Sequence, residues 1–175
     1  MTKIKYIITN DTTQQIKEII DSSLPELKLT EFITIISNNS PDQLIEILNK
    51  DQQQIKLSSI QYKYIEYIYE ILKIKSMEYQ DTKILIIENF SKFLNNLSSN
   101  ILINENQLNV LVFEIFKKFR NLDYDLKVND ESEEEGEGRN QEEVDDLEIE
   151  KNHIEVYIID TKRRKFLEIL SDEVR

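Results

Sequence analysis

Apolar residues recur at helical spacing along most of this chain. The most regular stretch follows Asn104 and Gln107, where apolar side chains succeed one another every three or four residues: Leu108, Leu111, Val112, Ile115, Phe116, Phe119 and Leu122. Such spacing places the side chains on one face of an α-helix. Similar patterns begin near residues 12, 26, 41, 58 and 81. Together these segments predict an all-α body between about residues 10 and 124.

Two of the expected helices carry clear start signals. Ser40 suits the N-cap, Pro41 suits the first helical position, and Gln43 can bond back to the amide of the cap. Asn104 and Gln107 repeat this capping-box spacing. Because amphipathic helices need partners for their apolar faces, we expect an irregular helical bundle or a short helical-hairpin array of about six to seven helices.

The negative charge of the chain is concentrated in one segment. The formal net charge is −12, and residues 130–150 contain twelve acids and one base, a local charge of −11. A segment so charged and so poor in apolar residues is typical of disorder. We therefore expect a helical body over 1–128, a disordered acidic low-complexity segment over 129–148, and a C-terminal part over 149–175 that packs back on the body.

Residues 154–159 allow two interpretations. Their β-branched content fits a short strand that pairs with residues 3–9, which have a similar composition. Alternatively they begin one helix that runs to about Leu170, with Val156, Ile159, Phe166 and Leu170 on one face. Isoleucine is used throughout this chain, as in AT-rich coding sequences, so its β-propensity carries less weight. We favour the helix.

The residue inventory leaves few groups for catalysis. The chain has no cysteine, which excludes a disulfide scaffold, a thiolate zinc site and a cysteine nucleophile. Its two glycines, Gly136 and Gly138, lie in the acidic segment, so neither a P-loop nor a dinucleotide-binding turn is predicted. The one histidine, His153, is expected at the surface. We predict no catalytic, cofactor-binding or metal-ligating residue, no cofactor, and no enzymatic activity.

Charge and hydropathy also bear on partners and location. Outside residues 130–150 the net charge is −1, which argues against a broad surface for nucleic acid or for anionic membranes. The longest apolar runs have four residues, too short to span a bilayer, and no secretory signal is visible. We expect a soluble intracellular protein of the cytoplasm, the nucleus or both.

The leading functional hypothesis is a non-enzymatic helical protein–protein interaction module. It would be a small adaptor or a subunit of a larger assembly, with a protein partner and no nucleic acid, membrane or small-molecule substrate. Tyr62 and Tyr69 are candidate contacts, because they lie seven residues apart on one expected helix and tyrosine is enriched at binding hot spots.

An alternative hypothesis is an acidic chaperone or escort for a basic protein, such as a histone or a ribosomal protein. It would act through residues 130–150, with Glu133, Glu134 and Glu135 as candidate contacts. The one basic cluster is also a candidate contact region, although it equally fits a nuclear-localisation signal or a basic turn that screens the acidic segment. This basic cluster consists of Lys162, Arg163, Arg164 and Lys165.

Overall fold

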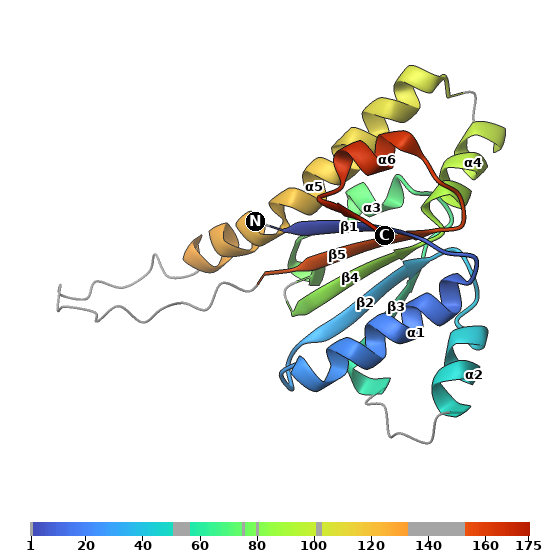
Figure 1. Cartoon of the computed structure of the whole chain (residues 1–175). Helices are drawn as coiled ribbons and strands as arrows, with labels where there is room; N and C mark the ends of the chain where they lie inside the picture. Colours follow the sequence, from blue (N-terminus) through green and yellow to red (C-terminus); the bar gives the residue numbers. More distant parts are fainter. Residues whose placement is uncertain (1, 51–56, 75, 80, 101–102, 133–152) are drawn as a thin grey trace, which may run out of the picture.

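The computed structural model describes residues 2–50, 57–74, 76–79, 81–100, 103–132 and 153–175, and it shows an α/β fold (Figure 1). Six parallel strands form one sheet in the order β3-β2-β4-β5-β1-β6. The all-α prediction is therefore wrong. The strands are β1 (Lys3–Ile8), β2 (Phe32–Ser37), β3 (Ile60–Tyr64), β4 (Thr82–Glu88), β5 (Glu155–Asp160) and β6 (Glu173–Val174).

Helices cover both faces of the sheet. Helices α1 and α2 lie on one face, and α3, α4, α5 and α6 lie on the other (Figure 1). Each face thereby gains its own apolar layer. The helices are α1 (Thr12–Ser23), α2 (Asp42–Lys50), α3 (Glu70–Lys73), α4 (Phe90–Asn100), α5 (Glu105–Ser132) and α6 (Lys165–Leu170), with 3₁₀ turns η1 (Leu24–Glu26), η2 (Leu57–Ser59) and η3 (Ser76–Tyr79).

The expected stripe on α5 packs against the sheet. Val112, Ile115, Phe116, Phe119 and Leu122 are all buried in one core layer. The capping box that starts this helix also forms. The Asn104 amide donates to Gln107 Oε1 at 3.0 Å, and the Gln107 amide donates to Asn104 Oδ1 at 2.9 Å. The helices predicted near residues 12, 41 and 104 are thus confirmed as α1, α2 and α5.

Three other expected helices are wrong in whole or in part. The segment from residue 26 forms β2 after the turn η1, and the segment from residue 58 forms β3 and the short α3. The segment from residue 81 divides into β4 and α4. The strands of a parallel sheet covered on both faces are apolar on both faces, so they lack the alternation that marks a half-buried strand. Short apolar runs of this kind resemble a buried helix in periodicity.

The prediction for the C-terminal part contains the same error. Residues 155–160 form β5, which pairs in parallel with β1 from Lys3↔Glu155 to Ile8↔Asp160. The favoured long helix is wrong, and the alternative of a strand beside residues 3–9 is confirmed. The β-propensity of isoleucine carries full weight in this chain. In this chain isoleucine fills the sheet as well as the helices.

The leading function is corrected together with the fold. A six-stranded parallel sheet is not a helical bundle, so the helical interaction module has no structural basis here. Glu133, Glu134 and Glu135 lie outside the described residues, and the α/β fold gives no support to the acidic escort. None of the helices described is both long and apolar enough to cross a membrane.

The order of the strands also fixes where a site is expected. The chain leaves β2 through α2 on one face and leaves β4 through α4 and α5 on the other face. Because these connections depart to opposite sides, a crevice opens between the carboxyl ends of β2 and β4. In open α/β sheets, ligands bind at such a switch point.

Candidate functional site

A small pocket lies at this switch point. It is formed by the start of α1, the β2–α2 turn, α2, β3 and the end of β4. Its lining residues are Thr13, Ile16, Asn39, Ser40, Gln43, Leu44, Tyr62 and Glu88. Most of these side chains are polar, and Glu88 is the one carboxylate among them. The switch point therefore offers a polar depression with a single acid at its base.

Glu88 is the last residue of β4 and is 5% exposed. The Thr12 hydroxyl donates to its Oε1 at 2.8 Å, and the Ser37 hydroxyl donates to its Oε2 at 2.5 Å. Thr12 begins α1 and Ser37 ends β2. One buried carboxylate thus joins α1, β2 and β4. The two hydrogen bonds also offset the free-energy cost of burying this polar group.

Two side chains bond to Asn39, which lines the pocket together with Tyr62. The Tyr62 hydroxyl donates to the carbonyl oxygen of Asn39 at 2.9 Å, and Lys92 Nζ donates to Asn39 Oδ1 at 2.7 Å. Burial raises the pKa of the Tyr62 phenol, and the Glu88 charge adds to this rise, although a hydrogen bond with Ser37 lowers it. The phenol therefore stays protonated at neutral pH and serves as a donor.

A second buried carboxylate lies at the end of β5, on the other side of the sheet edge. Asp160 is 1% exposed, and its Oδ2 accepts from the Ser91 amide at 2.9 Å and from the Ser91 hydroxyl at 2.5 Å. Its Oδ1 accepts from the Thr161 amide at 2.8 Å. Ser91 lies in the first turn of α4. Asp160 thus places a negative charge at the positive end of that helix, a favourable arrangement.

Arg164 extends this second cluster. Its Nε donates to the Ser91 hydroxyl oxygen at 2.6 Å, and a terminal guanidinium nitrogen donates to Asn95 Oδ1 at 2.7 Å. Ser91 therefore donates to Asp160 and accepts from Arg164. The chain of bonds connects the β5–α6 turn to α4.

The first strand–helix turn at this edge has no phosphate-binding character. It consists of Thr9, Asn10 and Asp11, without the glycines that let a backbone approach a phosphate closely. The Thr9 amide donates to the carbonyl oxygen of Asp160 at 2.9 Å. Asp11 is the N-cap of α1, where its carboxylate accepts from the Gln14 amide at 2.9 Å. The groups that would face a phosphate are used within the chain.

Asn89 joins the two carboxylate clusters. It follows Glu88 and has φ of 55°, a left-handed conformation that asparagine adopts more readily than most residues. Its amide donates to the carbonyl oxygen of Ile159 at 2.8 Å, which fixes the end of β4 against β5. A non-glycine residue in this conformation costs free energy and persists only where the surrounding structure holds the backbone in place.

The chemistry of this carboxyl edge is limited by its internal bonding. Each buried carboxylate receives donors from its own chain on both oxygens. Within the described ranges, no group of three or more His, Asp or Glu side chains is arranged to hold a metal ion.

The predicted contact residues fall in several places. Tyr62 lies on β3 and Tyr69 just before α3, so they do not share a helix face as expected. The Tyr69 ring stacks on Tyr67 with centroids 5.4 Å apart. The basic cluster forms the β5–α6 turn and the start of α6, at the carboxyl edge, and Arg163 pairs with Glu168.

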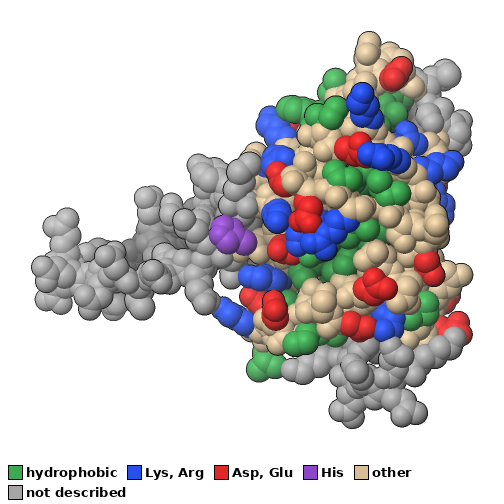
Figure 2. Space-filling view, in the orientation of Figure 1, with side chains coloured by type: hydrophobic (Ala, Val, Ile, Leu, Met, Phe, Trp, Pro, Cys, Tyr) green, Lys and Arg blue, Asp and Glu red, His purple; other side chains and the backbone are tan. Residues whose placement is uncertain are grey.

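The basic cluster is separated from His153 by the length of β5. Residue 153 precedes the amino end of that strand, and Lys162 follows its carboxyl end. Six residues of parallel strand span about 20 Å. Figure 2 shows Lys and Arg side chains interspersed with Asp and Glu over the visible face, without a broad field of one sign.

Sequence reasoning missed Glu88 and Asp160. Each is the acid that directly ends an apolar run, in the segments ILIIE and VYIID. An acid at the carboxyl end of a buried strand would have marked both as site candidates, but this signal requires the strands to be recognised first. Comparisons of the sequence with protein-family models and with curated proteins give no match.

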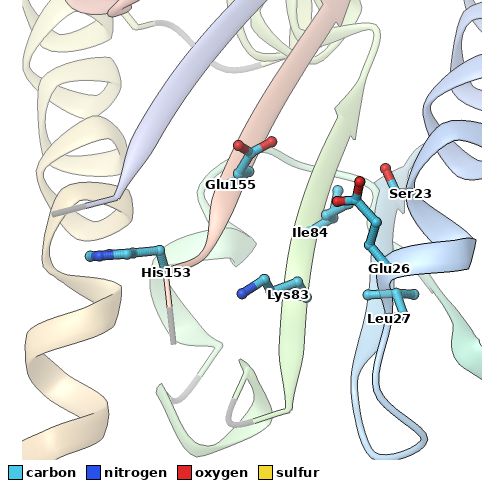
Figure 3. A pocket seen from close by; sticks show the side chains of 7 residues that line it. All are labelled: Ser23, Glu26, Leu27, Lys83, Ile84, His153 and Glu155. Atoms are coloured by element: carbon cyan, nitrogen blue, oxygen red, sulfur yellow. The ribbon is translucent and has the colours of Figure 1, made fainter. Parts of the chain in front are cut away.

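A larger hollow lies at the opposite, amino edge of the sheet (Figure 3). It is bordered by η1 and by the first residues of β4 and β5. Beside it, Lys5 Nζ bonds to Glu155 Oε2 at 2.7 Å and to the Tyr157 hydroxyl oxygen at 2.8 Å. Burial opposes the charge of Glu155, yet the bonds from Lys5 and Tyr157 leave its pKa below the usual value. Glu155 therefore stays ionised at neutral pH.

Proposed function

We propose that this protein is a non-enzymatic α/β domain that acts by binding other molecules. The observation that carries the proposal is the state of the two buried carboxylates at the carboxyl edge. Glu88 accepts hydroxyl donors from α1 and β2, and Asp160 accepts donors from α4. These are the positions where α/β enzymes place groups that touch a ligand. In this protein the two carboxylates at these positions bond to neighbouring helices and strands of the same chain instead.

The lining of the switch-point pocket supports the same proposal. A general acid–base mechanism needs a titratable group with a free lone pair or proton that reaches the substrate. Of the pocket residues, only Glu88 and Tyr62 titrate in such a role. Both oxygens of Glu88 accept hydrogen bonds, and the Tyr62 hydroxyl donates its hydrogen bond to the carbonyl oxygen of Asn39. The pocket therefore lacks an available acid–base pair among the residues described.

Substitution of the carboxylates tests this proposal. We expect Glu88→Gln and Asp160→Asn each to lower the free energy of unfolding by about 1–3 kcal/mol, because each weakens charge-assisted bonds between buried groups. For a chain of this size that corresponds to about 2–4 °C in Tm per kcal/mol. Thermal and urea unfolding measure the change. Glu18→Gln, on the exposed face of α1, is the matched control and should leave stability nearly unchanged.

Catalytic groups behave in the opposite way. Active sites are held in arrangements that cost stability, so replacing a catalytic carboxylate commonly leaves a protein as stable or more stable. A rise in Tm for Glu88→Gln and Asp160→Asn would therefore contradict the proposal and favour an enzyme.

A protein remains the proposed partner. Val110 and Phe113 lie one turn apart on the outer side of α5, and their side chains are 62% and 56% exposed. Aromatic side chains are enriched in protein interfaces. The absence of cysteine fits the reducing interior of a cell, so an intracellular location in cytoplasm or nucleus is part of the same proposal.

A pair of exposed apolar residues elsewhere provides the control for this surface. We expect Val110→Ser with Phe113→Ser to abolish capture of the natural partner from source extract, because it removes the apolar centre of the surface. Leu29→Ser with Ile169→Ser, at side chains that are 86% and 74% exposed, should leave capture intact. Equal capture by both double variants would exclude this surface of α5.

A further inference from the structure

The two edges of the sheet differ in length. The strand β6, at one end of the sheet, has two residues, whereas β3, at the other end, has five. Natural proteins keep edge strands short or cover them, because the unpaired backbone groups of an edge pair readily with another strand. The β3 edge therefore presents the longer row of backbone groups to a further strand.

The direction of these backbone groups follows from the pairing of β3 with β2. Just after β3, the Ile65 amide donates to the carbonyl oxygen of Ser37 at 3.0 Å. Because backbone groups alternate between the two sides of a strand, those of Ile60, Tyr62 and Tyr64 point away from β2, to the open edge. In the ranges that the structure describes, no other segment bonds to the backbone groups of these three residues. They are therefore available to a further strand.

The side chains of β3 leave this edge unprotected. Tyr64 is 65% exposed. Lysine commonly guards an edge strand, but Lys63 Nζ pairs with Glu78 at 2.7 Å and lies 5.5 Å from the centre of the Tyr79 ring. Both of these partners belong to η3 of the same chain. The edge thus carries an exposed aromatic ring, and its one lysine is held by the chain's own η3.

A second copy of β3 matches this edge in antiparallel register. With Tyr62 opposite Tyr62 of the second copy, Ile60 lies opposite Tyr64, and Gln61 lies opposite Lys63. The residues with open backbone groups then face one another, so each such pair exchanges both of its N–H···O bonds. Aromatic and β-branched side chains meet across the strands, and no like charges are directly opposite. Both features stabilise a strand pair.

We propose that the β3 edge binds the β3 edge of a second copy of this chain, which joins two sheets into one continuous sheet about a two-fold axis. Two-fold contacts are the commonest in homo-oligomers. A single pair of short strands is a small contact, and contacts below about 1,200 Å² form weak complexes, so the dimer forms at micromolar to submillimolar concentrations. The proposal concerns a different surface from that of α5 around Val110 and Phe113.

Sedimentation equilibrium of the full chain measures this association. Tyr64→Pro removes an outward amide, and proline is tolerated in an edge strand where its nitrogen faces solvent, so the sheet of the single chain is kept. Because each copy loses a backbone hydrogen bond, we expect this variant to dimerise about 10- to 100-fold more weakly. Tyr64→Phe keeps both the amide and the ring and should dimerise as the unsubstituted protein does.

Two results would overturn the proposal. One is equal dimerisation by Tyr64→Phe and by Tyr64→Pro, with circular dichroism showing that the proline variant is folded. The other is a monomer at every concentration measured, which would leave the edge to an extended peptide of another protein.

The absence of cysteine allows a disulfide to report the register. Gln61 and Lys63 of the second copy form a pair without mutual hydrogen bonds, so their Cα atoms lie about 4.5 Å apart, within the range of about 4.4–6.8 Å that a disulfide spans. Oxidation of mixed Gln61→Cys and Lys63→Cys proteins should therefore give a cross-linked heterodimer, identified by its mass. Each variant alone should cross-link poorly, because its two cysteines lie about 8 Å apart. Equal cross-linking of the mixture and of either variant alone would contradict the antiparallel register.

Discussion

Asn38 follows the last residue of β2, at the switch point of the sheet. Within the part of the chain that the structure describes, both polar atoms of its side chain are buried and have no hydrogen-bond partner. A buried amide without partners costs free energy, because water satisfied it in the unfolded chain. The neighbouring Asn39 differs, since its side chain accepts from Lys92 and its carbonyl accepts from Tyr62. Two adjacent asparagines thus contribute to stability with opposite signs.

We expect Asn38→Ala to raise the free energy of unfolding by about 1 kcal/mol, because it removes an unsatisfied buried amide. Asn39→Ala is the matched substitution and should lower the free energy of unfolding by a few tenths of a kcal/mol, since it removes a partly exposed bond. Urea unfolding at neutral pH measures both changes. A loss of stability for Asn38→Ala comparable to that of other buried positions would show that the amide has a partner in solution.

At the scale of elements, the limits of prediction follow from periodicity. α1, α2 and α5 could be predicted because one face of each is polar and because residues such as Asn104 mark their starts. β2 and β4 could not, since their segments FITIIS and TKILIIE are apolar in both alternating positions. Glu88 and Asp160 were missed with them, because their significance depends on ending a strand. Local chemistry could thus predict the helices, whereas the strands are determined by burial between two helical layers.

Tyr6 shows how the elements are joined across the sequence. It lies in β1 with no exposed surface, its hydroxyl donates to the carbonyl oxygen of Lys162 at 2.7 Å, and the Arg164 amide donates to that hydroxyl at 3.2 Å. Burial raises the pKa of this phenol to about 12, and the Asp160 charge adds to the rise. The fold is therefore stabilised by the protonated phenol.

This pKa predicts an alkaline loss of stability. Because the pKa in the folded chain exceeds the unfolded value of about 10, the contribution is complete below pH 10 and is lost as pH rises towards 12. We expect Tyr6→Phe to lower stability by about 1 kcal/mol at neutral pH and to reduce the further loss between pH 10 and 12. Urea unfolding across this range measures it. Tyr64→Phe, at a side chain 65% exposed, should keep the alkaline loss, and its disappearance there would contradict the assignment to Tyr6.

At the scale of the whole molecule, the sheet is assembled from both ends of the chain. β5 lies between β4 and β1, and β1 lies between β5 and β6. The last residues also bond to β1, where the Arg175 amide donates to the carbonyl oxygen of Tyr6 at 2.9 Å. The N-terminal strand therefore has no described strand partner apart from the C-terminal ones. Residues 153–175 are therefore part of the sheet itself, through β5 and β6.

A chain ended at residue 132 tests whether the rest of the sheet folds without the C-terminal strands. Without β5, β1 loses both of its neighbours and β4 gains an open edge, and the buried faces of Ile84, Ile86 and Ile87 lose their lateral cover. An interior strand cannot be removed without exposing apolar surface and unpaired backbone groups on both sides. We expect this shortened chain to lack a cooperative urea transition and dispersed amide signals, whereas the full chain shows both. A cooperative transition in residues 1–132 would instead establish an independently folding body, to which the C-terminal strands are an addition.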